Sequence, residues 1–349
     1  VIYGPNNSGK TSILSSLLYA KKLIFENNSL LFNELIQKLA LLKNSELMND
    51  NTEWVFEFLI NNTIYRYKIF LSKNGIEFEE LIKYNNSRDS KDYLIFRRKN
   101  NVVDLNNDFA ELNLNLEHIN CTLLSYLSLF SKSNYISLVL SEINKFYSFD
   151  DNTSISSNIS NDFNIQILDE QKNKLLRIFK YMDLNIIDIE IKKTYNNEYL
   201  ILLTKQNSFG VFKVLLNEES KSTQKTIKLI CNLIELSELG GGLLIIDELD
   251  SSLHPKLLGY IINSFHSDNN KNIQVLFTSN DIYTLDRRFF RKDEIYFTCL
   301  DRNHYTDLVC LNEFKDIKEG NSYSKKYTEG SLGFEPSIAR MKDWDDSSN

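Results

Sequence analysis

Residues 4–11 read GPNNSGKT and match the pattern Gly-x-x-x-x-Gly-Lys-[Ser/Thr], which is typical of a phosphate-binding loop. In such a loop, backbone N–H groups surround phosphate oxygens at the N-terminus of a helix, where the helix dipole favours an anion. Gly4 and Gly9 permit the tight backbone path, Lys10 is expected to reach the β- and γ-phosphates, and Thr11 is expected to bind Mg²⁺. The residues predicted to hold the phosphates are Gly4, Pro5, Asn6, Asn7, Ser8, Gly9, Lys10, Thr11 and Ser12.

A second chemical element follows the apolar run 243–246, where Asp247 and Glu248 come directly after four apolar residues. A buried strand of this kind carries a carboxylate to its C-terminal end, where ligands bind in open α/β sheets. Asp247 is the Walker B aspartate in this interpretation and is predicted to hold Mg²⁺. Glu248 is placed to polarise the attacking water as a general base. The simpler alternative is that Glu248 is a solvated carboxylate beside a structural aspartate.

Two further polar segments have informative positions relative to Asp247. The segment ESKSTQKTIKLI contains Ser220 and Ser222 about 25 residues before it, and VLFTSND ends a predicted strand with Asn280, 33 residues after it. A helix that opens with serines offers free N–H groups and hydroxyls to a phosphate. Ser220 or Ser222 could equally serve as a helix N-cap.

Hydrophobic periodicity indicates which elements hold these residues. Apolar spacing predicts helices over 8–24 and 30–42, alternation of aromatic and β-branched residues predicts an antiparallel sheet over 54–98, and 106–149 is expected to be mostly helical. A Ser/Asn/Asp-rich loop is predicted at 150–164 and a helix at 170–181. The remaining predicted strands are 186–193, 199–204, 243–249, 273–279, 294–300 and 306–311, with helices at 222–238 and 255–266 and a short helix after 279.

Alternating helices and apolar strands in the last third predict a mainly parallel α/β sheet covered on both faces. The strand that precedes the phosphate-binding loop belongs to this sheet, although more than 200 residues separate it from the other strands. By analogy with the lobes of similar ATPase heads, we expect one or two more strands before Val1, roughly 20–40 residues. The fold class predicted is therefore an α/β P-loop NTPase with an additional antiparallel lobe and a helical insert.

Composition excludes several classes of protein. The chain has 349 residues, a formal net charge of −7 and 42% hydrophobic residues, which is ordinary for a globular protein and unlike a basic nucleic-acid binder. Its four cysteines lack Cys-x-x-Cys spacing, so neither a zinc site nor a disulfide framework is expected. Without a signal peptide or an apolar run of about 18 residues, we expect a cytoplasmic protein with no membrane partner.

The segments GPNNSGKT, IIDELDSSLHP and FTSND together resemble the ATPase heads of the ABC class, and most closely those of the SMC, RecF and OLD-type group. This group includes many ATPases of prokaryotic anti-phage, abortive-infection systems. The resemblance covers about 1–25 and 215–335. It implies that two copies sandwich ATP in a homodimer or a higher homo-oligomer, with Ser220 and Ser222 capping the nucleotide of the partner copy. Asp250 would then lie in the D-loop at the dimer seam, and Asn280 would take the catalytic switch position.

Two positions depart from the pattern of that group. Ser222 stands where the signature segment has glycine, and its Cβ would crowd the phosphate. Asn280 stands where the switch residue is usually histidine, and asparagine hydrogen-bonds but carries no positive charge. We therefore expect slow hydrolysis, in which ATP serves more as a clamp than as fuel.

The function predicted is an ATP- and Mg²⁺-dependent dimerising switch, the ATPase regulator of a prokaryotic anti-phage defence system that controls a separate effector protein. The alternative is a RecF- or SMC-like repair ATPase with DNA or RNA as partner, and a third is a non-hydrolysing scaffold. No nuclease is expected within this chain, since only about 35 residues follow the last strand. The predicted organisation is 1–100 for lobe I, 101–184 for a helical insert with its flexible loop at 150–164, 185–312 for lobe II and 313–349 for a C-terminal tail.

Overall fold

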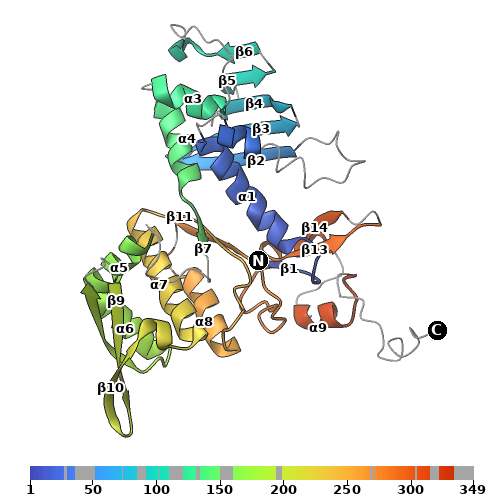
Figure 1. Cartoon of the computed structure of the whole chain (residues 1–349). Coiled ribbons are helices and arrows are strands. Elements are labelled where there is room, and N and C mark those ends of the chain that lie inside the picture. Colours follow the sequence, from blue (N-terminus) through green and yellow to red (C-terminus); the bar gives the residue numbers. More distant parts are fainter. Residues whose placement is uncertain are drawn as a thin grey trace, which may run out of the picture. The chain divides into compact units, whose positions relative to one another are not determined.

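The computed structural model of the chain divides into two compact units, formed by residues 1–14 with 147–349 and by residues 15–146 (Figure 1). It describes residues 1–26, 30–35, 52–72, 74–84, 92–100, 102–109, 121–130, 134–149, 160–193, 199–267, 270, 272–302, 305–314 and 322–333. Within these residues, no helix is long and apolar enough to cross a membrane.

The first unit is built around two short sheets that join side by side. Their hydrogen-bonded orders are β1–β13–β14 and β12–β11–β7, and β1 with β13 and β11 with β12 run parallel. A parallel bridge from Ile2 to Thr278, together with the Ser279 N–H donating to the Ile2 carbonyl (3.1 Å), links the two sheets. The strands are β1 (Ile2–Tyr3), β7 (Phe146–Phe149), β11 (Gly242–Ile246), β12 (Ile273–Phe277), β13 (Tyr296–Leu300) and β14 (Thr306–Cys310).

Two long helices cover these parallel strands. Helix α7 (Lys221–Glu238) and helix α8 (Pro255–Phe265) share one apolar core with the strands, in which Leu244 and Ile246 of β11 and Ile262 of α8 are completely buried. His254 caps α8 by accepting the Lys256 N–H at Nδ1 (3.2 Å), and Pro255 occupies the first turn, where it needs no hydrogen-bond acceptor. Strand β11 therefore ends inside a well-packed layer, and Asp247 is the first residue after it.

The same unit contains a second, antiparallel sheet of order β10–β9–β8 (Figure 1). Residues of this sheet and of two helices form a separate core against the other side of α7, so that α7 is buried on both sides. The elements are α5 (Ser160–Glu170), α6 (Lys172–Tyr181), β8 (Ile186–Lys193), β9 (Tyr199–Asn207) and β10 (Gly210–Leu215). A short helix, α9 (Tyr323–Thr328), packs its Tyr327 ring against Phe297 at 5.5 Å.

The second unit is an antiparallel sheet of order β2–β3–β4–β5–β6 with helices α3 and α4. Its sequence alternates between buried and exposed residues, as expected for a sheet with one covered face. Glu79 is fully buried there and accepts the Leu123 and Leu124 N–H groups (2.7 and 2.8 Å) at the start of α3. The elements are β2 (Thr52–Ile60), β3 (Thr63–Ser72), β4 (Gly75–Lys83), β5 (Tyr93–Lys99), β6 (Val102–Leu105), α3 (Leu123–Phe130) and α4 (Asn134–Asn144).

Helix α1 (Lys10–Phe25) begins within the phosphate-binding loop, as predicted, and the mixed α/β fold with parallel strands and an antiparallel sheet is confirmed. Two local predictions were wrong: residues 146–149 form β7 instead of a helix, and helix α5 starts at Ser160 within the predicted loop. The short helix predicted between β12 and β13 is present as a single 3-10 turn, η6 (Lys292–Glu294), which follows a run of turns. The first part of that loop, 150–159, and residues 36–42 of the helix predicted over 30–42 lie outside the described residues, whereas 30–35 are helical as predicted.

Candidate nucleotide-binding site

The loop between β1 and α1 follows a path that depends on glycine. Gly4 and Gly9 have φ angles of +154° and +94°, and Asn7, at +63°, adopts a left-handed conformation that asparagine tolerates. A Cβ atom on Gly4 would lie 2.2 Å from Thr298 Oγ1 and 2.6 Å from the Thr298 carbonyl oxygen. The loop thus packs directly on β13 at a point where no side chain fits.

Lys10 is folded back onto this loop. Its side chain is 9% exposed, and Nζ donates to the carbonyl oxygens of Gly4 (2.8 Å) and Pro5 (3.0 Å). Burial lowers the pKa of Lys10, while the nearby carboxylates of Asp247 and Glu248 oppose this shift. The amine is therefore held at the mouth of the loop as a charged donor. A phosphate could replace its two present acceptors, the carbonyl groups of Gly4 and Pro5.

A hydroxyl pair anchors the middle of the loop. Ser8 is 2% exposed, its Oγ lies 2.5 Å from Thr298 Oγ1 and also donates to the Pro5 carbonyl (2.8 Å). The other predicted loop residues, Asn6, Asn7, Thr11 and Ser12, are exposed and open to a ligand. Thr298 was not singled out from the sequence, because an isolated threonine in an apolar strand gives no signal of contact with a loop almost 300 residues away.

Asp247 is held by two hydroxyl groups, one on each carboxylate oxygen. Thr11 Oγ1 donates to Oδ2 (2.7 Å), and Thr278 Oγ1 donates to Oδ1 (2.5 Å). The structure therefore brings together the two residues predicted to bind Mg²⁺, although 236 residues separate them. A carboxylate and a hydroxyl are hard oxygen ligands of the kind that Mg²⁺ takes, so this donor set fits the ion.

Glu248 and Asn280 lie beside this aspartate. Glu248 has a left-handed φ of +48°, and its N–H donates to the buried hydroxyl of Thr278 (2.7 Å). The Asn280 N–H donates to Asp250 Oδ1 (3.1 Å), which ties the end of β12 to the turn after β11. Both side chains are exposed, as a residue acting on bound water requires. Thr278 was quoted within FTSND but received no role in the sequence analysis.

The two serines at the start of α7 make their hydrogen bonds locally. Ser220 is the N-cap, and its Oγ accepts the Thr223 N–H (3.2 Å), while the Ser222 carbonyl accepts the Thr226 hydroxyl (2.7 Å). The N-cap interpretation of Ser220 is thus confirmed. Within the described part of this chain, no hydrogen bond joins either serine to the phosphate-binding loop, and both make their bonds inside the first turns of α7.

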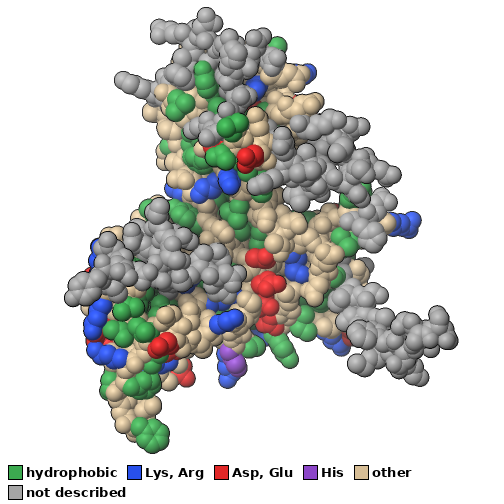
Figure 2. Space-filling model, viewed as in Figure 1, with side chains coloured by type: hydrophobic (Ala, Val, Ile, Leu, Met, Phe, Trp, Pro, Cys, Tyr) green, Lys and Arg blue, Asp and Glu red, His purple; other side chains and the backbone are tan. Residues whose placement is uncertain are grey.

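Charge is unevenly distributed over the surface. One face shows a contiguous group of acidic side chains, while its lysines and arginines are scattered among polar and apolar residues (Figure 2). On this face the described residues form no continuous basic surface of the kind that a duplex requires.

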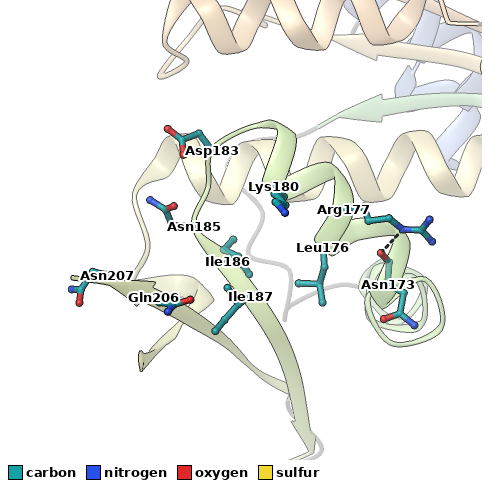
Figure 3. A pocket seen from close by; sticks show the side chains of 10 residues that line it. All are labelled: Asn173, Leu176, Arg177, Lys180, Asp183, Asn185, Ile186, Ile187, Gln206 and Asn207. Carbon is teal, nitrogen blue, oxygen red and sulfur yellow. Dashed lines mark hydrogen bonds between the residues drawn. The ribbon is translucent and has the colours of Figure 1, made fainter. Parts of the chain in front are cut away.

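A separate open groove of about 1160 Å³ lies between α6 and the ends of β8 and β9 (Figure 3). Asn173, Arg177 and Lys180 line it from α6, and Asn185, Gln206 and Asn207 line it from the sheet side. It shares no lining residue with the phosphate-binding loop, and its charged groups are exposed. Exposed charges of this kind give no indication of a specific ligand.

This chain is similar to one family of known proteins and, more weakly, to two solved structures. A family model described as "AAA domain, putative AbiEii toxin, Type IV TA system" matches residues 1–286. Among curated proteins, no sequence is significantly similar to this chain. A crystal structure of the SmcHead bound to the C-winged helix domain of ScpA is similar at 11% identity and a TM-score of 0.42, covering 89% of this chain and 90% of that one. The SMC head domain from Thermotoga maritima gives 13% identity and a TM-score of 0.34, with 88% of each chain covered.

Proposed function

This chain belongs to the AAA-domain family whose description names AbiEii and type IV toxin–antitoxin systems, and from that premise we propose that it is an ATP-dependent dimerising switch. It binds ATP with Mg²⁺, hydrolyses it slowly, and acts as the ATPase regulator of a prokaryotic anti-phage defence system that controls a separate effector. P-loop ATPases of this family bind ATP with Mg²⁺ as a class, and the dimerisation, the slow hydrolysis and the regulatory role are the parts that we add.

The observation that carries the proposal is the hydrogen bond from Thr11 Oγ1 to Asp247 Oδ2 (2.7 Å). It joins the start of α1 to the end of β11, so the phosphate-binding loop and the Walker B carboxylate form one site. Asp247 is also oriented by Thr278, so both oxygens of its carboxylate accept a hydrogen bond from the protein itself. A preformed pair of this kind supports metal-assisted phosphate chemistry over a chance motif in a surface loop.

Each residue has a role in the proposed reaction. Backbone N–H groups of the loop and the N-terminus of α1 bind the phosphates. Lys10 exchanges its hydrogen bonds to the Gly4 and Pro5 carbonyls for bonds to the phosphates, whose negative charge it neutralises. Thr11 and Asp247 would hold Mg²⁺, and the bound ion would supply charge stabilisation for phosphoryl transfer. Glu248 accepts a proton from the attacking water, and Asn280 orients that water by hydrogen bonding.

Dimerisation supplies what one chain lacks. Ser220 and Ser222 lie outside the contacts of the phosphate-binding loop in their own chain, which supports a role on the nucleotide of a second copy. Asp250 would lie at the seam between the copies, where its bond to the Asn280 N–H connects the seam with the proposed switch. Since Asn280 can hydrogen-bond but cannot carry a positive charge, hydrolysis is slow and the ATP-bound dimer is long-lived.

Steady-state ATP hydrolysis tests the enzymatic part. We expect turnover below about one per second, the low end of common enzymes, and a loss of about 100-fold or more in Glu248→Gln with ATP binding retained. Glu329→Gln, which changes an exposed carboxylate at the C-cap of α9, is the matched control and should leave turnover unchanged. Turnover well above one per second contradicts the clamp, and unchanged turnover in Glu248→Gln contradicts its role as base.

Affinity capture of Glu248→Gln from its host, with ATP and Mg²⁺, tests the regulatory part. The proposal predicts a stoichiometric protein partner with effector chemistry, such as a nuclease or another toxin. Co-purifying DNA without a protein partner contradicts it and favours the repair-type alternative.

A further inference from the structure

Lys225 is a buried lysine near the start of α7, the fifth of the 18 residues of that helix. Its side chain is 1% exposed, and a buried ammonium group is costly unless its hydrogen bonds are satisfied. Nζ donates to the Glu248 carbonyl (2.9 Å), the Ser251 carbonyl (3.0 Å) and the Ser251 hydroxyl (2.7 Å). These three acceptors match the three donors of an ammonium group, and all of them belong to one four-residue turn.

That turn contains the proposed base in a conformation that needs support. Glu248 has φ +48°, a region that residues other than glycine occupy at an energetic cost. Its N–H is bound by Thr278 Oγ1 (2.7 Å), and its carbonyl accepts both the Ser251 N–H (3.0 Å) and Lys225 Nζ. The N–H group of Glu248 is therefore held by Thr278, the residue after β12, and its carbonyl group is held by Lys225 of α7.

Helix α7 also presents the segment that we propose to meet the nucleotide of the partner copy. Ser220 caps the helix, and Ser222 lies in its first turn, less than two turns before Lys225. Buried on both sides, the helix is expected to move as a stiff element. A displacement of its first turn would then reach Glu248 through the Lys225 ammonium group.

We propose that Lys225 is a positioning residue that holds the turn 248–251 in its reactive geometry and couples it to the start of α7. Its effect on catalysis rests on the proposed function of Glu248, whereas its effect on the turn does not. Lys225 touches neither nucleotide nor water in this scheme and acts through the backbone of Glu248 and Ser251.

The test compares Lys225→Met, which keeps length and removes the charge, with Lys228→Met on the same helix. Lys228 is the matched control, because it is 7% exposed and its Nζ lies 5.4 Å from the Phe149 ring centroid, at a different surface of α7. In hydrogen–deuterium exchange without nucleotide, we expect the amides of Leu249 and Ser251 to exchange at least about tenfold faster in Lys225→Met only. In steady-state kinetics, kcat should fall about 10- to 100-fold with KM changed less than about threefold.

Lys225→Arg keeps a donor at this position and should recover part of the exchange protection and of kcat. If Lys225→Met fails to fold, Ser251→Ala, which removes one acceptor, replaces it and should shift exchange in the same direction. Unchanged exchange at the turn, or an equal change in Lys228→Met, overturns the proposal. If the unmodified protein hydrolyses no ATP, the proposed function fails, and the exchange measurement still decides whether Lys225 supports the turn.

Discussion

At the scale of single residues, the buried hydroxyl of Thr278 connects the two carboxylates that matter most. It donates to Asp247 Oδ1 (2.5 Å) and accepts the Glu248 N–H (2.7 Å), and the residue is completely buried. One side chain therefore sets both the orientation of the proposed metal ligand and the backbone of the proposed base. A threonine provides the single donor and the acceptor lone pairs that this double contact needs.

Replacing Thr278 by valine removes that hydroxyl and leaves the Glu248 N–H without its acceptor. We expect a loss of about 1–3 kcal/mol in the free energy of unfolding and at least a tenfold drop in kcat. Thr278→Ser keeps the hydroxyl and is the control, with kcat within a few fold of the unmodified protein. Urea unfolding and ATPase assays measure the two quantities, and wild-type turnover in Thr278→Val would show that Asp247 needs no such support.

The residues of the motifs could be predicted from sequence because the chemistry restricts both type and spacing. Gly4, Lys10 and Thr11 belong to a pattern that few other functions produce, and the apolar run before Asp247 places it at a strand end. Thr278 and Lys225 could not be predicted. A threonine at the end of a strand and a lysine within a helix are common on surfaces, and only tertiary packing makes them buried contacts.

At the scale of elements, the connection from α7 to β11 depends on a run of three glycines. Gly240 and Gly241 have φ angles of +81° and +113°, and the Gly241 N–H donates to the Leu236 carbonyl (2.8 Å) to end the helix. A Cβ on Gly241 would lie 2.2 Å from the Asn272 carbonyl oxygen, whereas a Cβ on Gly240 meets nothing within 4 Å. Gly241 therefore lies tightly against the residues that lead into β12, whereas Gly240 does not.

We therefore expect Gly241→Ala to destabilise the protein much more than Gly240→Ala. Both changes place alanine at positive φ, which costs about 1–2 kcal/mol. Gly241→Ala adds a clash with backbone, and we expect its total loss in the free energy of unfolding to exceed about 3 kcal/mol. Thermal and urea unfolding of the two variants compare them directly, and equal losses would show that the turn moves freely away from Asn272.

The elements predicted most successfully are those with long periodic patterns, such as α1, α7 and the antiparallel strands β2 to β5. The short strand β7 was missed because residues 146–149 come at the end of a segment with a helical pattern. Their strand conformation depends on pairing with β11, which is distant in the sequence. Strand β10 was also missed, since its residues are mostly exposed and its alternation is weak. Between β12 and η6, the Asp281 and Asp286 side chains accept backbone N–H groups in turns, which competes with helix formation there.

At the scale of the whole molecule, the candidate site assembles from segments at both ends of the chain. The loop at 4–11 meets β13 and the ends of β11 and β12, all within the unit formed by 1–14 and 147–349. The motifs allowed this convergence to be predicted, but not the division into two units, because sequence separation carries no information on packing between distant segments. The functional division into 1–100, 101–184, 185–312 and 313–349 stays a prediction.

The molecular mass in solution, measured by light scattering with and without ATP and Mg²⁺, tests the central claim most directly. For Glu248→Gln, which should bind ATP without hydrolysing it, the account predicts a change from the monomer mass of 40.8 kDa to about twice that value. Lys10→Ala, which should lose the nucleotide, serves as the control and should stay monomeric. A mass of 40.8 kDa for Glu248→Gln with ATP demonstrably bound would contradict the dimerising switch.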